Sequence, residues 1–203
     1  MPGGIPNSIN ACNQFFSHLV GVGTHEFESN AHGAIAPLAV NFGAAGTATL
    51  HGNGYVEQGT PGQTNGFGRY PVSGSKCWEA DNNFSITFSQ PIAAFGFFAV
   101  DIGDFSGQVT LALDSGGIEV INVPTPANAP GGSVAYVGLI RFTGPLITGI
   151  SFGNTAAGTD FFAFDDFSIG APGQVIPLPP AAWTGLATLA ALGGLRQIRR
   201  RAR

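Results

Sequence analysis

The chain has 203 residues, of which 10% are charged, and it contains 31 Gly and 17 Phe. Few charges together with many glycines and phenylalanines exclude a helical bundle and favour short strands joined by tight turns. Before residue 175 the chain has three Lys and Arg against twelve Asp and Glu, a net charge of −9. Because nothing basic could track phosphates there, nucleic acid is not expected as a partner.

Residues 1–21 form the first unit and predict a short helical lead-in. Between Ser8 and Val20 an apolar stripe recurs at i, i+3, i+4 and i+7, made of Cys12, Phe15, Phe16 and Leu19. Ser8 has the side chain of an N-cap, and Gly21 is suited to end the helix. The sequence therefore predicts a helix from Ser8 to Val20.

After this helix the pattern changes to a period of two, which is typical of strands. Ala45–His51 and Phe67–Val72 are weak strand candidates. Residues 84–89 (FSITFS) alternate cleanly until Pro91 breaks the pattern. Ala93–Val100 is almost entirely apolar, so it predicts a central strand that is buried on both faces.

The second half of the chain predicts a hairpin and further strands. Residues 108–113 alternate, Asp114–Gly117 is a turn, and Ile118–Val123 returns. More strands are expected at Val134–Phe142, Ile147–Gly153 and Phe161–Ile169. Strands at this spacing predict that residues 22–170 form an all-β domain, an antiparallel β-sandwich, with residues 171–180 as a linker.

Two groups of carboxylates have a spacing that suits a functional site. Asp101 and Asp104 follow the buried strand, where they could be the acid pair of a glycosidase or could stabilise a turn. Asp165 and Asp166 lie inside the last strand, so one of them shares a face with aromatic residues. A carboxylate in that position needs a hydrogen-bonding partner or a metal ion. The sequence has no nucleophile motif, so no catalytic residue is assigned.

The carboxyl-terminal segment has a proline cluster, then an uncharged run from Ala181 to Leu195, then a basic end. Fifteen helical residues rise about 22 Å, and the apolar residues before them extend this toward the ~30 Å of a hydrocarbon core. A buried soluble helix is the alternative, but such a helix rarely lacks a polar face. Residues 181–203 therefore predict a transmembrane helix and a basic cytoplasmic tail. The expected anchor is Trp183, Leu186, Leu189, Leu192 and Leu195, and the basic stop is Arg196, Arg199, Arg200, Arg201 and Arg203.

This tail resembles the PEP-CTERM sorting signal of Gram-negative bacteria. The motif would comprise Val175, Pro177, Leu178, Pro179 and Pro180, with leucine in place of the central glutamate. The resemblance implies an exosortase-like membrane protease as a partner. It also implies an inner-membrane protein with a periplasmic body, which reaches the cell surface or extracellular matrix after processing. Met1–Gln14 lacks the features of a signal peptide, so we expect either a start upstream of Met1 or a tail-anchored cytoplasmic protein.

Residues 84–169 are similar to the sandwich domains that precede such tails, which have a jelly-roll look shared with carbohydrate-binding modules. Such modules often hold one structural calcium where the first and last strands meet. The resemblance implies a calcium site made by Glu28 with Asp165 and Asp166. An exported protein with an even cysteine count also predicts a Cys12–Cys77 disulfide, although two buried thiols are the equal alternative.

Three functions are consistent with these features. The first is a non-enzymatic, structural or adhesive surface protein. The second is a module that binds extracellular polysaccharide, with Trp78 or the tyrosines Tyr55, Tyr70 and Tyr136 as stacking faces. The third is a hydrolase that uses Asp101 and Asp104.

Overall fold

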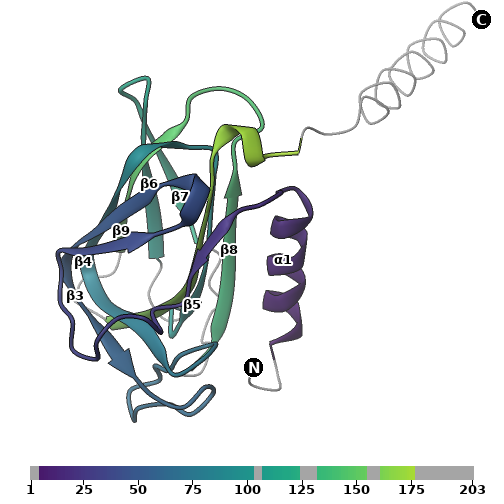
Figure 1. Ribbon diagram of the computed structural model, residues 1–203. Coiled ribbons are helices and arrows are strands. Elements are labelled where there is room, and N and C mark those ends of the chain that lie inside the picture. Colours follow the sequence, from purple (N-terminus) through teal and green to yellow (C-terminus); the bar gives the residue numbers. More distant parts are fainter. Residues whose placement is uncertain (1–4, 103–106, 124–131, 155–160, 177–203) are drawn as a thin grey trace, which may run out of the picture.

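The computed structural model describes residues 5–102, 107–123, 132–154 and 161–176 (Figure 1). Within these ranges the chain forms one α-helix, ten strands and two short 3-10 helices. The helix and the first four strands are α1 (Pro6–Ser17), β1 (Gly23–His25), β2 (Leu38–Asn41), β3 (Thr47–Gln58) and β4 (Lys76–Ile92). The remaining strands are β5 (Ala94–Val100), β6 (Gly107–Leu113), β7 (Ile118–Asn122), β8 (Val134–Ile140), β9 (Ile147–Asn154) and β10 (Phe161–Gly170). The 3-10 helices are Gly43–Ala45 and Pro172–Gln174.

The strands confirm the all-β antiparallel sandwich. They follow the order β7-β6-β9-β4-β10-β5-β8, with β1 added to β10 and the β2–β3 pair added to β4. Every described pairing is antiparallel. The first and last strands are neighbours, since Gly23 lies opposite Ile169 and His25 opposite Phe167.

Strand β4 connects the two layers of the sandwich. Its first part, up to Asp81, pairs with β10, and its second part, from Phe84, pairs with β9. The register against β3 shifts between Gly52 and Gly54 at the same level, where Gly52 has a φ of 91°. A bulge at this level lets one long strand bend from one layer into the other.

The core between the layers is built mainly from phenylalanine. The rings of Phe84 and Phe152 stack at 4.7 Å, and Phe97 meets Phe164 edge to face at 5.8 Å. Strand β5 is buried at every position, as its apolar run predicts. Phe95 and Phe97 face this core, whereas Phe98 and Val100 face a second cluster on the outside of the sheet.

Helix α1 covers the outside of the sheet beside β8 (Figure 1). Phe15 of its predicted stripe is buried, whereas Leu19, also buried, lies beyond the helix, which ends at Ser17 and not at Val20 as predicted. The helix starts at Pro6, earlier than predicted, so the prediction of Ser8 as its N-cap is wrong. Ser8 instead donates its hydroxyl to Val134 O on β8 at 2.7 Å. Proline is favoured at the first helical position, because its φ is already helical and its missing N–H would have no partner within the helix.

Two other local predictions are wrong. Phe67–Val72 forms no strand, because Gly66 and Gly68 adopt φ values of 89° and 88° that interrupt extended structure. Pro91 does not end its strand, and β4 continues to Ile92. The β4–β9 register shifts between Thr87 and Ile92, so the missing N–H of Pro91 falls where the ladder is irregular.

Residues 171–176 are tied to the end of α1 and form no open linker. Val20 N donates to Gln174 O at 2.9 Å, and Ile176 N donates to His18 O at 2.8 Å. Val175, the first residue of the predicted sorting motif, forms an isolated bridge with Leu19. The rest of that motif, the predicted anchor and the arginines lie outside the described residues. No helix in the described ranges is long and apolar enough to cross a membrane.

Both cysteines are free thiols, so the predicted Cys12–Cys77 disulfide is absent from the structure. Cys77 is fully buried on β4, and the partly buried Cys12 of α1 packs against the same apolar cluster. Burial is the main cause that raises the pKa of both thiols. They act here as small hydrophobic side chains.

Candidate functional site

The aromatic residues expected to stack on a ligand are mostly inside the protein. Trp78 is 0% exposed and stacks on Phe27 in the core, so the prediction of Trp78 as a binding face is wrong. Tyr70 is buried and donates its hydroxyl to Gly132 O at 2.8 Å. Tyr136 packs between α1 and β5, against Phe15 and Phe98. Tyr55 differs from these residues, since its hydroxyl donates to an acidic polar group.

That polar group is the carboxylate of Glu79, which is buried on the outer face of β4. The Arg69 guanidinium lies 2.9 Å from Glu79 Oε1, and the Tyr55 hydroxyl donates to the same oxygen at 3.1 Å. The Asn65 side-chain amide donates to Glu79 Oε2 at 3.3 Å. A buried carboxylate is stable only with such partners, and these ones hold side chains from β3, β4 and a long loop together. Burial and then the negative charge of Glu79 raise the pKa of Tyr55, so its phenol stays a donor.

Two exposed phenylalanines flank the guanidinium. The Arg69 guanidinium carbon lies 5.4 Å from the ring centre of Phe67 and 5.5 Å from that of Phe161. These distances are within range for cation–π attraction. Phe67 is 71% exposed and Phe161 is 38% exposed. We call the set Tyr55, Asn65, Phe67, Arg69, Glu79 and Phe161 the Arg69 site.

Strand pairing brings the members of the Arg69 site together. Tyr55 of β3 lies opposite Glu79 of β4, and Phe161 of β10 lies opposite the nearby Asp81. Alternate residues of a strand share a face, so Glu79 and Asp81 both point away from the core side chain of Ala80. Asp81 is buried too, and it accepts a hydrogen bond from the exposed Asn53 amide at 2.9 Å.

The loop between β3 and β4 supplies Asn65, Phe67 and Arg69. Asn65 Oδ1 accepts the Phe67 N–H at 3.0 Å, and Asn65 N donates to Arg69 O at 2.9 Å. This side-chain turn orients the loop tip toward β4. A side chain at Gly68 would be strained, because its φ is 88° and an added Cβ would meet the Asp101 carboxylate.

Of the acid pair proposed for a hydrolase, the structure describes Asp101. Asp101 has a φ of 68° and accepts a hydrogen bond from Gly132 N at 3.1 Å, so its side chain ties the end of β5 to the segment before β8. Asp104 lies outside the described residues.

The carboxylates predicted to bind calcium converge on one segment, residues 72–76. Glu28 Oε1 accepts the N–H groups of Ser75 and Lys76, both at 2.7 Å. Asp165 Oδ2 accepts those of Val72 and Ser73 at 2.8 and 2.9 Å, and Asp166 Oδ1 accepts the Ser73 hydroxyl at 2.7 Å.

Hydrogen-bond donors thus occupy the oxygens that a cation would need. In the part of the chain that the structure describes, no three His, Cys, Asp or Glu residues are grouped to hold a metal ion. The calcium site therefore stays a prediction.

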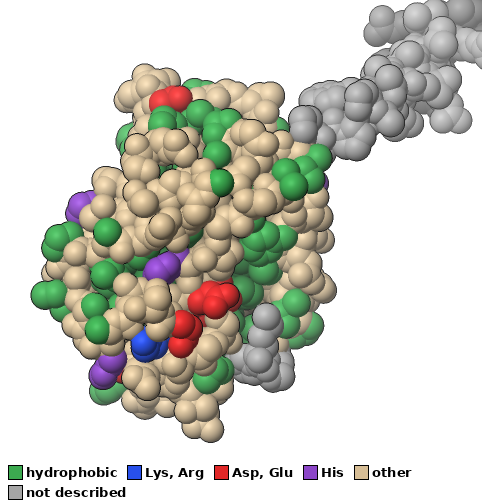
Figure 2. Space-filling model, in the orientation of Figure 1, with side chains coloured by type: hydrophobic (Ala, Val, Ile, Leu, Met, Phe, Trp, Pro, Cys, Tyr) green, Lys and Arg blue, Asp and Glu red, His purple; other side chains and the backbone are tan. Residues whose placement is uncertain are grey.

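Figure 2 shows that one face of the molecule carries few charged side chains, with acidic ones gathered beside a basic one.

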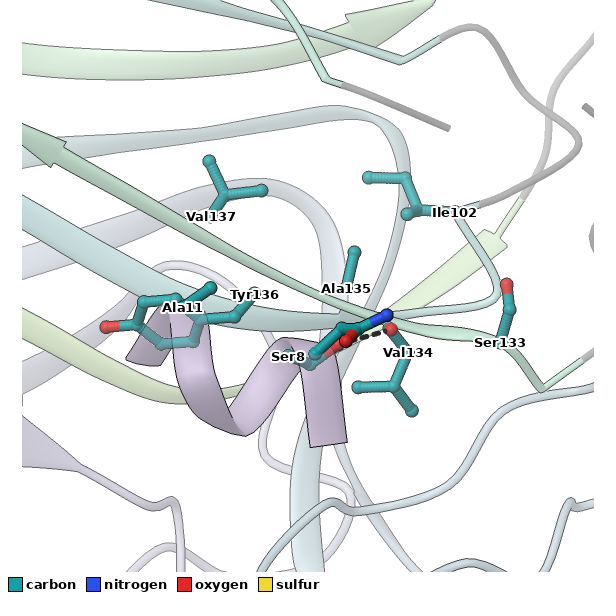
Figure 3. Close-up of a pocket in the computed structure, with 9 residues that line it drawn as sticks. Ser8, Ala11, Ile102, Ser133, Val134, Ala135, Tyr136 and Val137 are labelled. Carbon is teal, nitrogen blue, oxygen red and sulfur yellow. Dashed lines mark hydrogen bonds between the residues drawn. The ribbon is translucent and has the colours of Figure 1, made fainter. Parts of the chain in front are cut away.

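A concave feature lies between α1 and the outer edge of β8 (Figure 3). Its volume is about 230 Å³, and it is lined by Asn7, Ser8 and Ala11 of the helix, by Ile102, and by residues 133–137. The lining contains no charged side chain and is mainly apolar. The Arg69 site differs from it in combining exposed rings with a buried ion pair.

Sequence reasoning missed Phe67, Arg69, Glu79 and Phe161. One signal was present, because Arg69 is one of only three basic residues before position 175 and stands two residues from a phenylalanine in a glycine-rich stretch. Its partner Glu79 could not be identified, since the pair forms across a loop that no local pattern describes.

No family model and no curated protein matches the chain. Among solved structures, it is similar to the K2 cleaved adhesin domain of Lys-gingipain, with 13% identity, a TM-score of 0.45, and coverage of 73% of this chain and 97% of that one. It is also similar to the CBM22-1 xylan-binding domain from Paenibacillus barcinonensis, with 12% identity, a TM-score of 0.42, and coverage of 78% and 99%. A third is TmCBM61 in complex with β-1,4-galactotriose, with 17% identity, a TM-score of 0.39, and coverage of 72% and 99%. Similarity at this level says nothing about a ligand of this chain.

Proposed function

We propose that this chain is a non-catalytic adhesive module of the cell surface that binds extracellular polysaccharide through the Arg69 site. The observation that carries the proposal is the exposure of Phe67 and Phe161 close to a guanidinium that is paired with a buried carboxylate. Rings at a surface bury apolar area when they stack on the apolar face of a sugar ring. Fixed polar groups beside them can orient the sugar hydroxyls.

The charges of the site favour a neutral polysaccharide. The guanidinium of Arg69 is balanced by Glu79, so it adds no net positive charge for a uronate to meet. The acidic body would also repel an acidic polymer. Arg69 Nε is buried with no acceptor in the described part of the chain. A ligand oxygen that reached it would satisfy a donor whose isolation costs about 1–3 kcal/mol.

Replacement of Phe67 by Ala is expected to weaken binding about tenfold, because one stacking ring is lost while the buried pair stays intact. The measurement is electrophoresis of the purified protein through gels that contain xylan, galactan, mixed-linkage glucan or alginate. Retention is expected in at least one neutral gel and not in alginate. Phe142→Ala is the matched control, since Phe142 is 42% exposed and contacts His18 instead. Equal retention of the two variants would contradict the proposal.

We further propose that the tail holds the protein in the inner membrane and that an exosortase-like protease releases it. What supports this is the order of proline cluster, apolar run and five arginines in the sequence. Mass spectrometry of the protein recovered from an exosortase-bearing host should show loss of the segment after the proline cluster. An intact Arg203 in the recovered protein would show that the variant motif with Leu178 is not cut.

A further inference from the structure

Strand β7 is an edge strand with apolar side chains on its surface. Among the described residues it pairs with β6 alone. Ile118 is 74% exposed and Val120 is 52% exposed. Exposed apolar edges are rare in monomeric proteins because their free backbone groups pair with other strands.

The β6–β7 ladder determines which backbone groups are free. Leu113 N donates to Gly117 O, and Val123 N donates to Gly107 O, each at 2.9 Å. Between these two points, bonded and non-bonded pairs alternate along the antiparallel ladder. The register places Glu119 and Ile121 at the bonded positions. The N–H and C=O groups of Ile118, Val120 and Asn122 therefore point away from the sheet.

We infer that β7 pairs with β7 of a second copy of this chain, antiparallel, around a twofold axis at Val120. The outward residues are symmetric about that position, so Val120 meets its own copy and Ile118 meets Asn122 of the other chain. Every outward backbone group then has a partner, which a self-complementary interface requires.

Side chains and charges are compatible with this pairing. Ile118 and Val120 of both copies would lie on one face of the joined sheet, where each covers part of the other. Glu119 lies on the opposite face and pairs with Arg141, so the two copies bring no uncompensated charge together. The pairing would place two Arg69 sites on one particle, which increases avidity for a repeating polymer.

Disulfide cross-linking of the full chain tests the inference. In a bonded antiparallel pair the Cα atoms of opposite residues are about 5.5 Å apart, which is within disulfide reach. Val120→Cys is therefore expected to give a covalent dimer on mild oxidation. Ser115→Cys, at the exposed hairpin turn, is the matched control and is expected to form no covalent dimer. Val120→Lys should shift the native protein from dimer to monomer in sedimentation, whereas Ser115→Lys should not.

A wild-type protein that sediments as a monomer at all concentrations would overturn the pairing. So would equal cross-linking of the two cysteine variants. Cross-linking of Val120→Cys to a host protein instead of to itself would show a different occupant of this edge and would likewise overturn it. None of these outcomes depends on polysaccharide binding, so failure here is distinct from failure of the proposed function.

Discussion

Asp165→Ala is expected to destabilise the protein by about 3–5 kcal/mol, because it leaves several backbone donors without an acceptor at once. The Asp165 carboxylate is 0% exposed and accepts the N–H groups of Val72, Ser73 and Asp166. Each such donor costs about 1–3 kcal/mol when it is buried and unpaired. Equilibrium unfolding in urea measures the loss.

The conservative variant separates the loss of hydrogen bonds from the loss of side-chain volume. Asp165→Asn keeps one acceptor oxygen, so we expect it to lose less than half as much stability as Asp165→Ala. Equal losses in the two variants would indicate that packing volume, and not the N–H groups of Val72 and Ser73, sets the cost.

The same residue predicts a pH dependence. Burial and then the charge of Asp166 raise the pKa of Asp165 from 3.8 to about 8, although the N–H donors oppose this. The folded protein therefore holds this proton more tightly than the unfolded chain does. Stability from this group is complete at low pH and is lost as pH rises toward about 8. Burial also raises the pKa of Asp166, so the profile of Asp165→Asn should be shallower than that of the wild type without becoming flat.

Glu79→Ala is the second variant with a large expected effect, a loss of about 3–5 kcal/mol, because it leaves the Arg69 charge buried without a partner. The side chains of Glu79 and Arg69 are only 3% and 13% exposed. The Tyr55 hydroxyl and the Asn65 amide would lose their acceptor as well.

A double-mutant cycle checks this explanation. Arg69→Ala together with Glu79→Ala removes the unpaired charge, so the double variant should be more stable than Glu79→Ala alone. A double variant that loses the sum of the two single losses would show that the pair is not coupled.

Local patterns predicted much of the fold. The alternation of residues 84–89 and the apolar run of Ala93–Val100 each correspond to described strands, as do the two arms of the hairpin around Asp114–Gly117. These succeed because a period of two is a property of neighbouring residues. The resemblance to jelly-roll modules implied that the first and last strands can meet, and β1 pairs with β10 in the structure.

The Arg69 site could not be predicted in the same way. Period two shows that Trp78 and Glu79 point to opposite faces, but it does not show which face is covered. Trp78 was expected outside and is in the core, whereas Glu79 lies outside the core beneath the loop that carries Arg69. Long-range strand pairing decides which face is covered. The role of Asp165 could not be predicted for the same reason, because its hydrogen-bond partners Val72 and Ser73 lie far away in the sequence.

The most direct test of polysaccharide binding at the Arg69 site is a nitrogen–proton NMR titration with an oligosaccharide cut from the retained polymer. The Arg69 Nε–H belongs to a guanidinium that lies close to two rings, and it has no acceptor among the described residues, so its resonance reports on that site. We expect it to shift together with the backbone amides of Phe67 and Phe161. The Arg141 Nε–H, which donates to Pro145 O at 3.1 Å, should not move. Shifts confined to the hollow between α1 and β8, with the Arg69 resonance unchanged, would contradict the account.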